Sequence, residues 1–451
     1  MISRERGAGS GERGELQRRW RWRSVPFAIF AYALFPALLI YIAVRQCGKR
    51  PLIGVRAKLT GDLPAPRSPL PAPILIHGVS LGETALMRPL VPLLECNLQH
   101  PCLLTTTTET GWQGLEKSFP EHPKAFLPFD LPWAVELFLA RTRPAAVILL
   151  EAEFWPLWLC ACFRRGIPVA LVNARVSPRS FARFRTLLPF VRPLFAAYAS
   201  SLTQNGLYAA RLRALGARNA RPCGSLKADM IRLATADQCA AEAARCGLTA
   251  ERPVLLLAST SPDEERTVLA AWQAGGQPHR DWQIIICPRH PERGAELAQS
   301  LDRDYVRTSQ GGRLSAPEQV LIVDEIGHLG ALYGWCAAQG GIAVVGGSLG
   351  SGRGGQNMLE AAAARCATVV GWDTRSQPDA MHLLRVCGGV VECTPTSLAP
   401  ALAALADDLP RRQALGVAGN SAWQAGQGAA SRVLRALVRD LGPHLLPSAN
   451  R

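Results

Sequence analysis

Short apolar runs alternate with helical patterns along most of this chain. The runs that read as buried strands are residues 74–77, 103–106, 146–150, 169–173, 254–259, 283–288, 320–323, 342–345 and 367–370. Helical periodicity lies between them, for example at 83–96, 131–141 and 156–165. Strands that are apolar throughout and separated by helices are typical of a parallel sheet covered on both faces.

The pattern predicts two domains. Helical periodicity gives out between about Gly216 and Leu226, and the alternation then restarts. A chain of 451 residues also exceeds the size at which one core keeps growing. We therefore expect an α/β fold of two doubly wound, Rossmann-like domains that face each other across a cleft. The expected parts are residues 60–220, residues 225–430 and a C-terminal helix or tail at 431–451.

An uncharged run near the N-terminus changes this picture. Residues 25–44 contain no charged side chain, and the run is long enough to cross a bilayer as a helix. Arg45 follows it in place of a small-residue cleavage site, which favours an anchor over a secretory signal. Pro36 leaves open a helix that dips into one leaflet. The arginine-rich residues 1–24 are expected to be disordered.

The charge balance points to anionic partners. The chain has 50 Lys and Arg against 35 Asp and Glu, a net charge of +15. No helix-turn-helix, zinc-finger spacing or aromatic-basic RNA signature is present in the sequence, so a phosphorylated substrate or a membrane surface is favoured over nucleic acid. The thirteen cysteines are scattered without a C-x-x-C pair, which indicates reduced thiols in a reducing compartment.

Two motifs in the first half place carboxylates after strands. In HGVSLGE, Glu83 falls in the first turn of a helix, where it could act as a general base or simply complement the helix dipole. In ILLEAEFWP, Glu151 and Glu153 follow a buried strand. Unpaired buried charge is costly, so either catalysis or an ion pair with Arg175 or Arg179 would explain them.

Motifs in the second half suit a phosphate and a sugar. Arg289 in CPRHPER follows a strand and offers a planar fork of donors. The segment GGSLGSGRGGQNMLE, residues 346–360, leads from a strand into a helix. Its glycines let the backbone approach a phosphate, and Glu360 can accept hydrogen bonds from sugar hydroxyls. A glycine-rich turn without a ligand is the alternative.

These motifs resemble those of the bacterial 3-deoxy-D-manno-octulosonic acid (Kdo) transferases. The resemblance extends from the anchor to at least residue 375 and includes, in order, HGVSLGE, TTTTETG, FLPFDLP, ILLEAEFWP, VNARVS, GSLKAD, ASTSPDEE, CPRHPER and VVGGSLGSGRGGQNMLE. It implies a membrane-anchored GT-B glycosyltransferase of lipopolysaccharide biosynthesis. Its partners would be CMP-Kdo, a lipid A precursor and inner-membrane lipids, with the catalytic domains on the cytoplasmic face.

The resemblance also implies roles for single residues. Glu83 corresponds to the general base, and Glu151 and Lys227 correspond to groups that stabilise the transition state. The implied CMP-binding residues are Pro288, Arg289, Ile326, Gly327, His328, Asn357, Met358, Leu359 and Glu360. Because CMP is an activated leaving group, no cofactor and no metal are expected, and direct displacement would invert the anomeric centre.

The chain departs from the family pattern at a few positions. Gln356 and Ser261 stand where histidine is usual, and His328 stands where glutamate is usual. The glycine-rich segment has one additional residue at 350–352. Because Glu83 is retained, an active enzyme is expected. Two alternatives stay open: a membrane-anchored GT-B transferase with another donor or lipid acceptor, and a catalytically silent lipid-binding homologue.

Overall fold

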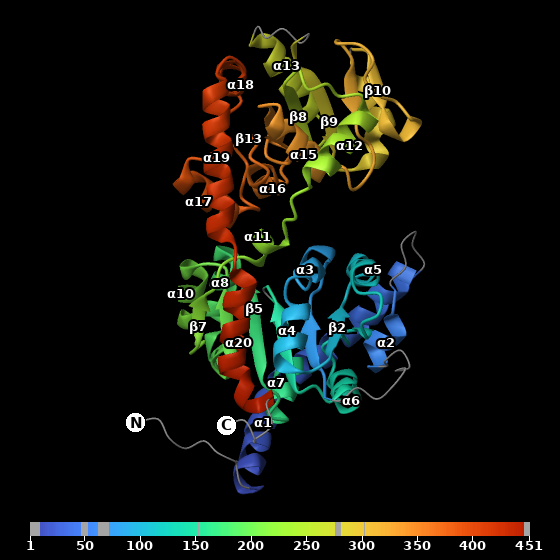
Figure 1. Ribbon diagram of the computed structural model, residues 1–451. Helices are drawn as coiled ribbons and strands as arrows, with labels where there is room; N and C mark the ends of the chain where they lie inside the picture. The colour runs from blue at the N-terminus through green and yellow to red at the C-terminus, as the bar shows by residue number, and fades with distance from the viewer. Residues whose placement is uncertain are drawn as a thin grey trace. The chain divides into compact units, whose positions relative to one another are not determined.

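The computed structural model describes residues 10–46, 53–61, 72–151, 153–275, 281–301 and 303–445. Its contacts divide the chain into two compact units, each with a seven-stranded sheet (Figure 1). Unit 1 comprises Met1–Met230 and Gly428–Arg451, and unit 2 comprises Ile231–Gln427. All strand pairs in both sheets are parallel, which confirms the predicted α/β class with two sheets.

The unit 1 sheet has the strand order β3-β2-β1-β4-β5-β6-β7. Its strands are β1 (Ile74–His77), β2 (Cys102–Thr106), β3 (Lys124–Phe126), β4 (Ala146–Leu150), β5 (Val169–Ala174), β6 (Ser200–Thr203) and β7 (Ala220–Pro222). The sequence predicted β1, β2, β4 and β5. It missed β3, β6 and β7, which are short and carry polar residues, so they lack the apolar run on which the prediction depended.

Helices cover both faces of this sheet. They are α1 (Ser10–Gln46), α2 (Val55–Thr60), α3 (Leu81–Ala85), α4 (Val91–Leu98), α5 (Glu109–Ser118), α6 (Pro132–Thr142), α7 (Pro156–Arg164), α8 (Pro178–Thr186), α9 (Leu188–Ala197), α10 (Gly206–Ala214), α11 (Leu226–Met230) and α20 (Ala429–Leu445). Side chains of β1 alternate between the two cores: Leu75 packs with Trp158 of α7, and Ile76 packs with Leu437 of α20. The predicted helix 83–96 is two helices, α3 and α4, separated by a segment that contains Pro89.

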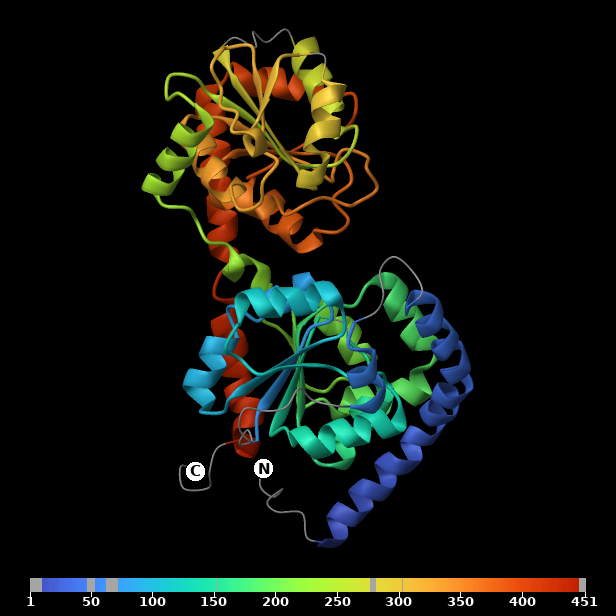
Figure 2. The same ribbon diagram turned by 90° about the vertical axis from the view of Figure 1, so that its right-hand side faces the viewer.

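Helix α1 corrects the prediction of a disordered N-terminus. Residues 10–24 are the beginning of α1, and residues 1–9 lie outside the described residues. Trp20 is 5% exposed and packs on Phe163 of α7 with ring centroids 4.8 Å apart. That aromatic burial stabilises helix where composition alone indicated disorder. By length and composition, Arg18–Gln46 could cross a membrane, and α1 runs along one side of unit 1 (Figure 2).

The unit 2 sheet has the order β10-β11-β9-β8-β12-β13-β14. Its strands are β8 (Val254–Thr260), β9 (Gln283–Pro288), β10 (Tyr305–Arg307), β11 (Val320–Ile322), β12 (Ile342–Val345), β13 (Ala367–Val370) and β14 (Val391–Glu392). Its helices are α12 (Ala236–Cys246), α13 (Glu264–Ala274), α14 (Gly294–Ser300), α15 (Leu329–Ala338), α16 (Met358–Ala363), α17 (Pro378–Cys387), α18 (Leu398–Ala406) and α19 (Leu409–Gly426), with 3-10 turns η2 (Pro291–Arg293) and η3 (Thr308–Gln310).

The unit boundaries differ by a few residues from the expected ones. The sequence placed residues 225–430 in the second domain, whereas the contacts place α11 and the residues from Gly428 onward in unit 1. Asp229 of α11 explains this, because its carboxylate accepts the N–H groups of Gly428 at 2.7 Å and Ala430 at 2.6 Å. The chain passes from unit 1 to unit 2 after Met230 and returns after Gln427, and these hydrogen bonds join the unit 1 ends of both connections.

Each sheet has a point where the strand order reverses. In unit 1 it lies between β1 and β4, and in unit 2 between β8 and β12. In open α/β sheets, ligands bind outside the carboxyl ends of the strands at such points. The loops after these four strands are therefore where functional side chains are expected.

Candidate functional site

Three glutamates gather at the reversal point of unit 1. Glu83 lies in α3, just after β1, and Glu151 and Glu153 follow β4, which pairs directly with β1. We call these three residues the acidic cluster. All three are partly buried, and the pKa values of Glu83 and Glu153 are raised, first by burial and then by the charges of neighbouring glutamates in the cluster. Such mutual repulsion between carboxylates is typical of a functional site.

Glu83 is held by the loop that precedes it. The N–H of Val79 donates to Oε2 of Glu83 at 2.5 Å. The carbonyl of Val79 in turn accepts from the hydroxyls of Thr106 at 2.9 Å and Thr108 at 2.6 Å. The TTTTETG motif therefore fixes the HGVSLGE loop, and that loop fixes the carboxylate.

Burial raises the pKa of Glu83 above its ordinary value, and the charge of Glu151 adds to this. The hydrogen bond from Val79 opposes the shift, because it favours the ionised form. A carboxylate whose pKa is moved toward neutrality removes a proton more readily than an ordinary glutamate does. Glu83 is thus suited to general-base chemistry.

Glu151 and Glu153 differ in how they are held. Glu151 has a positive φ of 61°, a conformation that non-glycine residues rarely adopt and that is often found at active sites. Glu153 accepts a hydrogen bond from Nε1 of Trp155 at 2.7 Å. Burial, followed by the charge of Glu83, raises the pKa of Glu153 to about 7. Among the described residues, no ion pair joins either glutamate to Arg175 or Arg179.

Lys227 is fixed to the same edge of the unit 1 sheet. The N–H of Leu226 donates to Oδ1 of Asn173 at 3.0 Å, and Asn173 lies in β5, the neighbour of β4. The motif VNARVS therefore positions the motif GSLKAD. The three residues predicted as catalytic, Glu83, Glu151 and Lys227, all come from segments at the carboxyl ends of the unit 1 strands.

In unit 2, a buried carboxylate holds the glycine loop, residues 346–357. Glu264 is 2% exposed. Its Oε2 accepts the N–H groups of Ser261 and Gly347, both at 2.7 Å, and its Oε1 accepts that of Leu349 at 2.9 Å. The first amides of the loop therefore bind a protein carboxylate, which corrects the view of the whole segment as a phosphate cradle. The sequence analysis missed Glu264 because acidic residues are common in the first turn of a helix.

The rest of the loop closes on itself and presents a basic side chain. Gly355 and Gln356 donate to the carbonyls of Gly347 and Gly346 at 2.7 and 2.9 Å. At the exposed tip, Nη1 of Arg353 lies 3.1 Å from Nε2 of His290, which follows β9. Arg289 is exposed beside it. Two basic side chains from two loops, Arg353 and His290, therefore meet in unit 2, and Arg289 directly precedes His290 in the chain.

The other residues predicted to bind CMP differ in how far their side chains are exposed. Pro288, Met358 and Leu359 are buried, so they can offer a ligand only backbone groups. Ile326 and Gly327 are exposed after β11. Asn357 donates through Nδ2 to Oε1 of Glu360 at 2.8 Å, which fixes the carboxylate at the start of α16.

The positions that depart from the family pattern have structural contacts. Nδ1 of His328 lies 2.9 Å from Oε2 of Glu242 in α12, so the ring faces that helix. Burial alone would raise the pKa of Glu242, but hydrogen bonds from Arg245 and His328 lower it overall. Ser261 is 1% exposed and serves the loop through its N–H. In the part of the chain that the structure describes, no group of three or more His, Cys, Asp and Glu is placed to hold a metal ion.

Comparisons with known proteins show which proteins this chain is similar to. A family model described as 3-deoxy-D-manno-octulosonic-acid transferase (kdotransferase) matches residues 53–230. The 3-deoxy-D-manno-octulosonic acid transferase of Bordetella pertussis is 38% identical over 83% of this chain and 89% of its own length. That of Haemophilus influenzae is 28% identical over 92% of this chain and 97% of its own length.

Solved structures add information on the fold alone. UDP-GlcNAc 2-epimerase from Neisseria meningitidis bound to UDP-GlcNAc matches with a TM-score of 0.57 at 13% identity, over 81% of this chain and 99% of that one. A putative UDP-N-acetylglucosamine 2-epimerase from Listeria monocytogenes matches with a TM-score of 0.57 at 14% identity, over 82% and 97%. The predicted GT-B fold and the predicted family are both confirmed. The chain belongs to the 3-deoxy-D-manno-octulosonic acid transferases, a family of glycosyltransferases.

Proposed function

We propose that this protein transfers Kdo from CMP-Kdo to a lipid A precursor, with inversion at the anomeric carbon and with Glu83 as the general base. The observation that carries the proposal is the acidic cluster at the reversal point of the unit 1 sheet. Within this cluster Glu83 is partly buried, its pKa is raised, and its carboxylate accepts a hydrogen bond from the N–H of Val79.

In the proposed reaction, a hydroxyl oxygen of the acceptor attacks the anomeric carbon of Kdo. Glu83 takes the proton of that hydroxyl as the new C–O bond forms. The bond between the anomeric carbon and the CMP phosphate oxygen breaks, and CMP leaves with the electron pair. Because attack and departure occur on opposite sides, the configuration inverts.

Glu151 and Lys227 are proposed to stabilise the transition state. The anomeric carbon gains positive character as the CMP oxygen leaves, and a nearby carboxylate lowers the energy of that charge. An ammonium group offsets the carboxylate of Kdo or the departing phosphate. The positive φ of Glu151 supports a role that requires its side chain in one direction.

Unit 2 is proposed to bind the donor. Arg289 and Arg353 suit the phosphate of CMP, because the guanidinium fork matches phosphate oxygens. Glu360, fixed by Asn357, suits the ribose hydroxyls. Backbone groups of residues 326–328 are proposed to contact the nucleotide. No metal or cofactor is proposed, because CMP leaves as an already activated phosphate.

Helix α1 and the net charge support action at a membrane. The segment Arg18–Gln46 is long and apolar enough to anchor the protein. A charge of +15 favours anionic lipids and a phosphorylated acceptor. We place the catalytic units on the cytoplasmic side of the inner membrane, where a cytidine nucleotide donor is made available.

The test is release of CMP by purified protein supplied with CMP-Kdo and a lipid A precursor, with mass spectrometry of the lipid product. We expect Glu83→Gln to lower turnover by about 10²- to 10⁴-fold, since that is the usual contribution of a general base. The control is Glu121→Gln, at an exposed loop position of the same unit. Equal turnover by both variants would refute the role of Glu83, and turnover of UDP-sugars in place of CMP-Kdo would refute the donor.

A further inference from the structure

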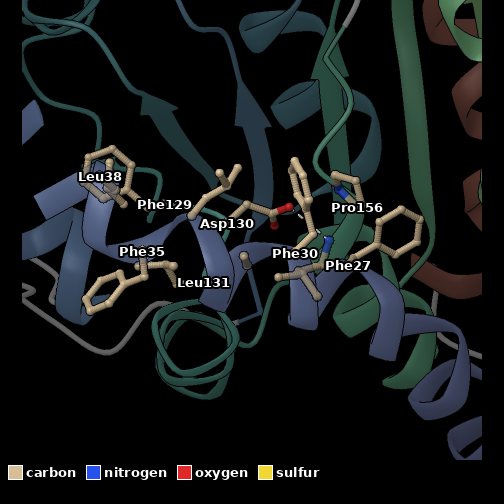
Figure 3. A pocket seen from close by; sticks show the side chains of 11 residues that line it. Phe27, Phe30, Phe35, Leu38, Phe129, Asp130, Leu131 and Pro156 are labelled. Carbon is tan, nitrogen blue, oxygen red and sulfur yellow. Dashed lines mark hydrogen bonds between the residues drawn. The ribbon is translucent and has the colours of Figure 1, made fainter.

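An apolar cavity of about 340 Å³ lies between α1 and the catalytic part of unit 1. Figure 3 shows its two walls. One wall is a stripe of α1 that includes Phe27, Ala31 and Leu38, spaced as one face of a helix. The other wall is formed by the β3–α6 loop and the start of α7, including Leu131 and Pro156.

The cavity contains one charged group, and that group is already bound. Asp130 accepts the N–H of Leu157 at 3.0 Å and that of Trp158 at 2.8 Å, so both of its oxygens cap helix α7. Burial raises the pKa of Asp130 to about 6, although the two hydrogen bonds oppose the shift. The remaining wall is hydrocarbon and aromatic, which suits an apolar ligand.

Part of the cavity lining is exposed on the surface of α1. Two of its lining residues, Phe30 and Leu34, are 65% and 48% exposed. The neighbouring helix surface continues with exposed Ile29 and Ile40. Where α1 lies in a bilayer, these side chains contact lipid tails, so the chemistry that meets the cavity mouth is a hydrocarbon chain. The volume is at the low end of the range for ligand pockets, which suits one chain rather than several.

The cavity adjoins the acidic cluster along the chain. Pro156 is three residues from Glu153, and Trp155, which donates to Glu153, lies between them. The loops after β3 and β4 both lie at the carboxyl ends of their strands, as does Glu83. Neighbouring segments at the same edge of the sheet therefore form the cavity and carry the acidic cluster.

We propose that this cavity binds one acyl chain of the glycolipid acceptor, and that it orients the acceptor hydroxyl toward Glu83. The inference rests on the proposed transferase function. Lipid tails in a bilayer are already in hydrocarbon, so entry of the chain gives little affinity. Its effect is positional: a held chain fixes the head group relative to the base, which raises the rate of the reaction.

The test compares an acylated acceptor in mixed micelles with the corresponding deacylated sugar phosphate. Ala31→Trp fills the cavity, and Ala33→Trp is the matched control on an exposed face of the same helix. We expect Ala31→Trp to lower turnover of the acylated acceptor about tenfold or more and to leave the deacylated acceptor unchanged. An equal loss for both acceptors, or no loss for either, would overturn the proposal.

A binding experiment keeps the two proposals separable. The wild-type protein in vesicles is irradiated with a lipid A precursor that carries a photoreactive group on an acyl chain, and the labelled peptides are identified. We expect labelling of residues 129–131 or 156–157. Unlabelled acceptor should suppress this labelling, and phospholipid should not. Equal suppression by phospholipid, or labelling confined to exposed positions such as Ile29, would overturn the inference. Absence of CMP release with both acceptors would instead refute the transferase function.

Discussion

Replacing Glu264 by glutamine is expected to loosen the glycine loop, although the two side chains have nearly the same size and shape. The carboxylate accepts three backbone N–H groups, from Ser261, Gly347 and Leu349, in a fully buried setting. An amide has one oxygen, so its NH₂ group must face at least one of these donors. The orientation that preserves most contacts leaves the N–H of Leu349 without an acceptor.

The cost follows from that single lost contact. A buried donor left unpaired costs about 1–3 kcal/mol, and the other two bonds weaken because the acceptor is no longer charged. We take about 2 kcal/mol as the central value. Since each 1.4 kcal/mol is a factor of ten, local opening of the loop becomes about 30-fold more frequent.

Hydrogen exchange measured by mass spectrometry on peptides from residues 346–357 reports this opening directly. Global melting is less suitable, because a chain with two units need not unfold in one step. The control is Glu251→Gln, at an exposed position of unit 2. Unchanged exchange of the loop in Glu264→Gln would refute the reasoning, as would an equal acceleration in the control.

Two further predictions concern unit 1. The pKa of Glu153 is raised from 4.5 to about 7, so its ionisation destabilises the wild type as the pH rises through that interval. We expect Glu153→Gln to match the wild type at pH 4, below the ordinary pKa of the carboxyl, and to be more stable at pH 8 by about 1–3 kcal/mol, the lower figure allowing for solvent screening. Thermal unfolding at the two pH values measures this, and a difference at pH 4 alone would contradict it. Trp20→Ala should destabilise unit 1 by about 3–5 kcal/mol in detergent melts. Trp22→Ala, at a 76% exposed position, should have no such effect, and equal losses would argue against the packing of α1.

The sequence predicts the sheets better than it predicts the loops. Apolar strands such as β1 and β9 are recognised because they are buried on both faces, and their position follows from composition alone. A polar strand such as β6 is recognised only through its pairing with β5, which is a long-range contact. No local pattern carries that information.

The candidate site shows the same division. Glu83 was identifiable because a strand and a helix start flank it in the sequence. Glu264 was not, because its partners at Gly347 and Leu349 are more than eighty residues away. A glycine-rich segment indicates a constrained backbone, and the sequence alone cannot state whether a ligand or a side chain supplies the constraint.

Because α20 at the end of the chain packs in unit 1, unit 2 is inserted in the sequence between two segments of unit 1. Residues 231–427 form one continuous segment, whereas unit 1 is assembled from two pieces. Leu437 and Leu441 of α20 are fully buried in the unit 1 core. A nonsense mutation after residue 427 therefore damages the half that carries Glu83 and spares the half that carries Arg289. For the same reason, unit 2 can be expressed as a single gene fragment, whereas unit 1 requires its two pieces to be joined by a new linker.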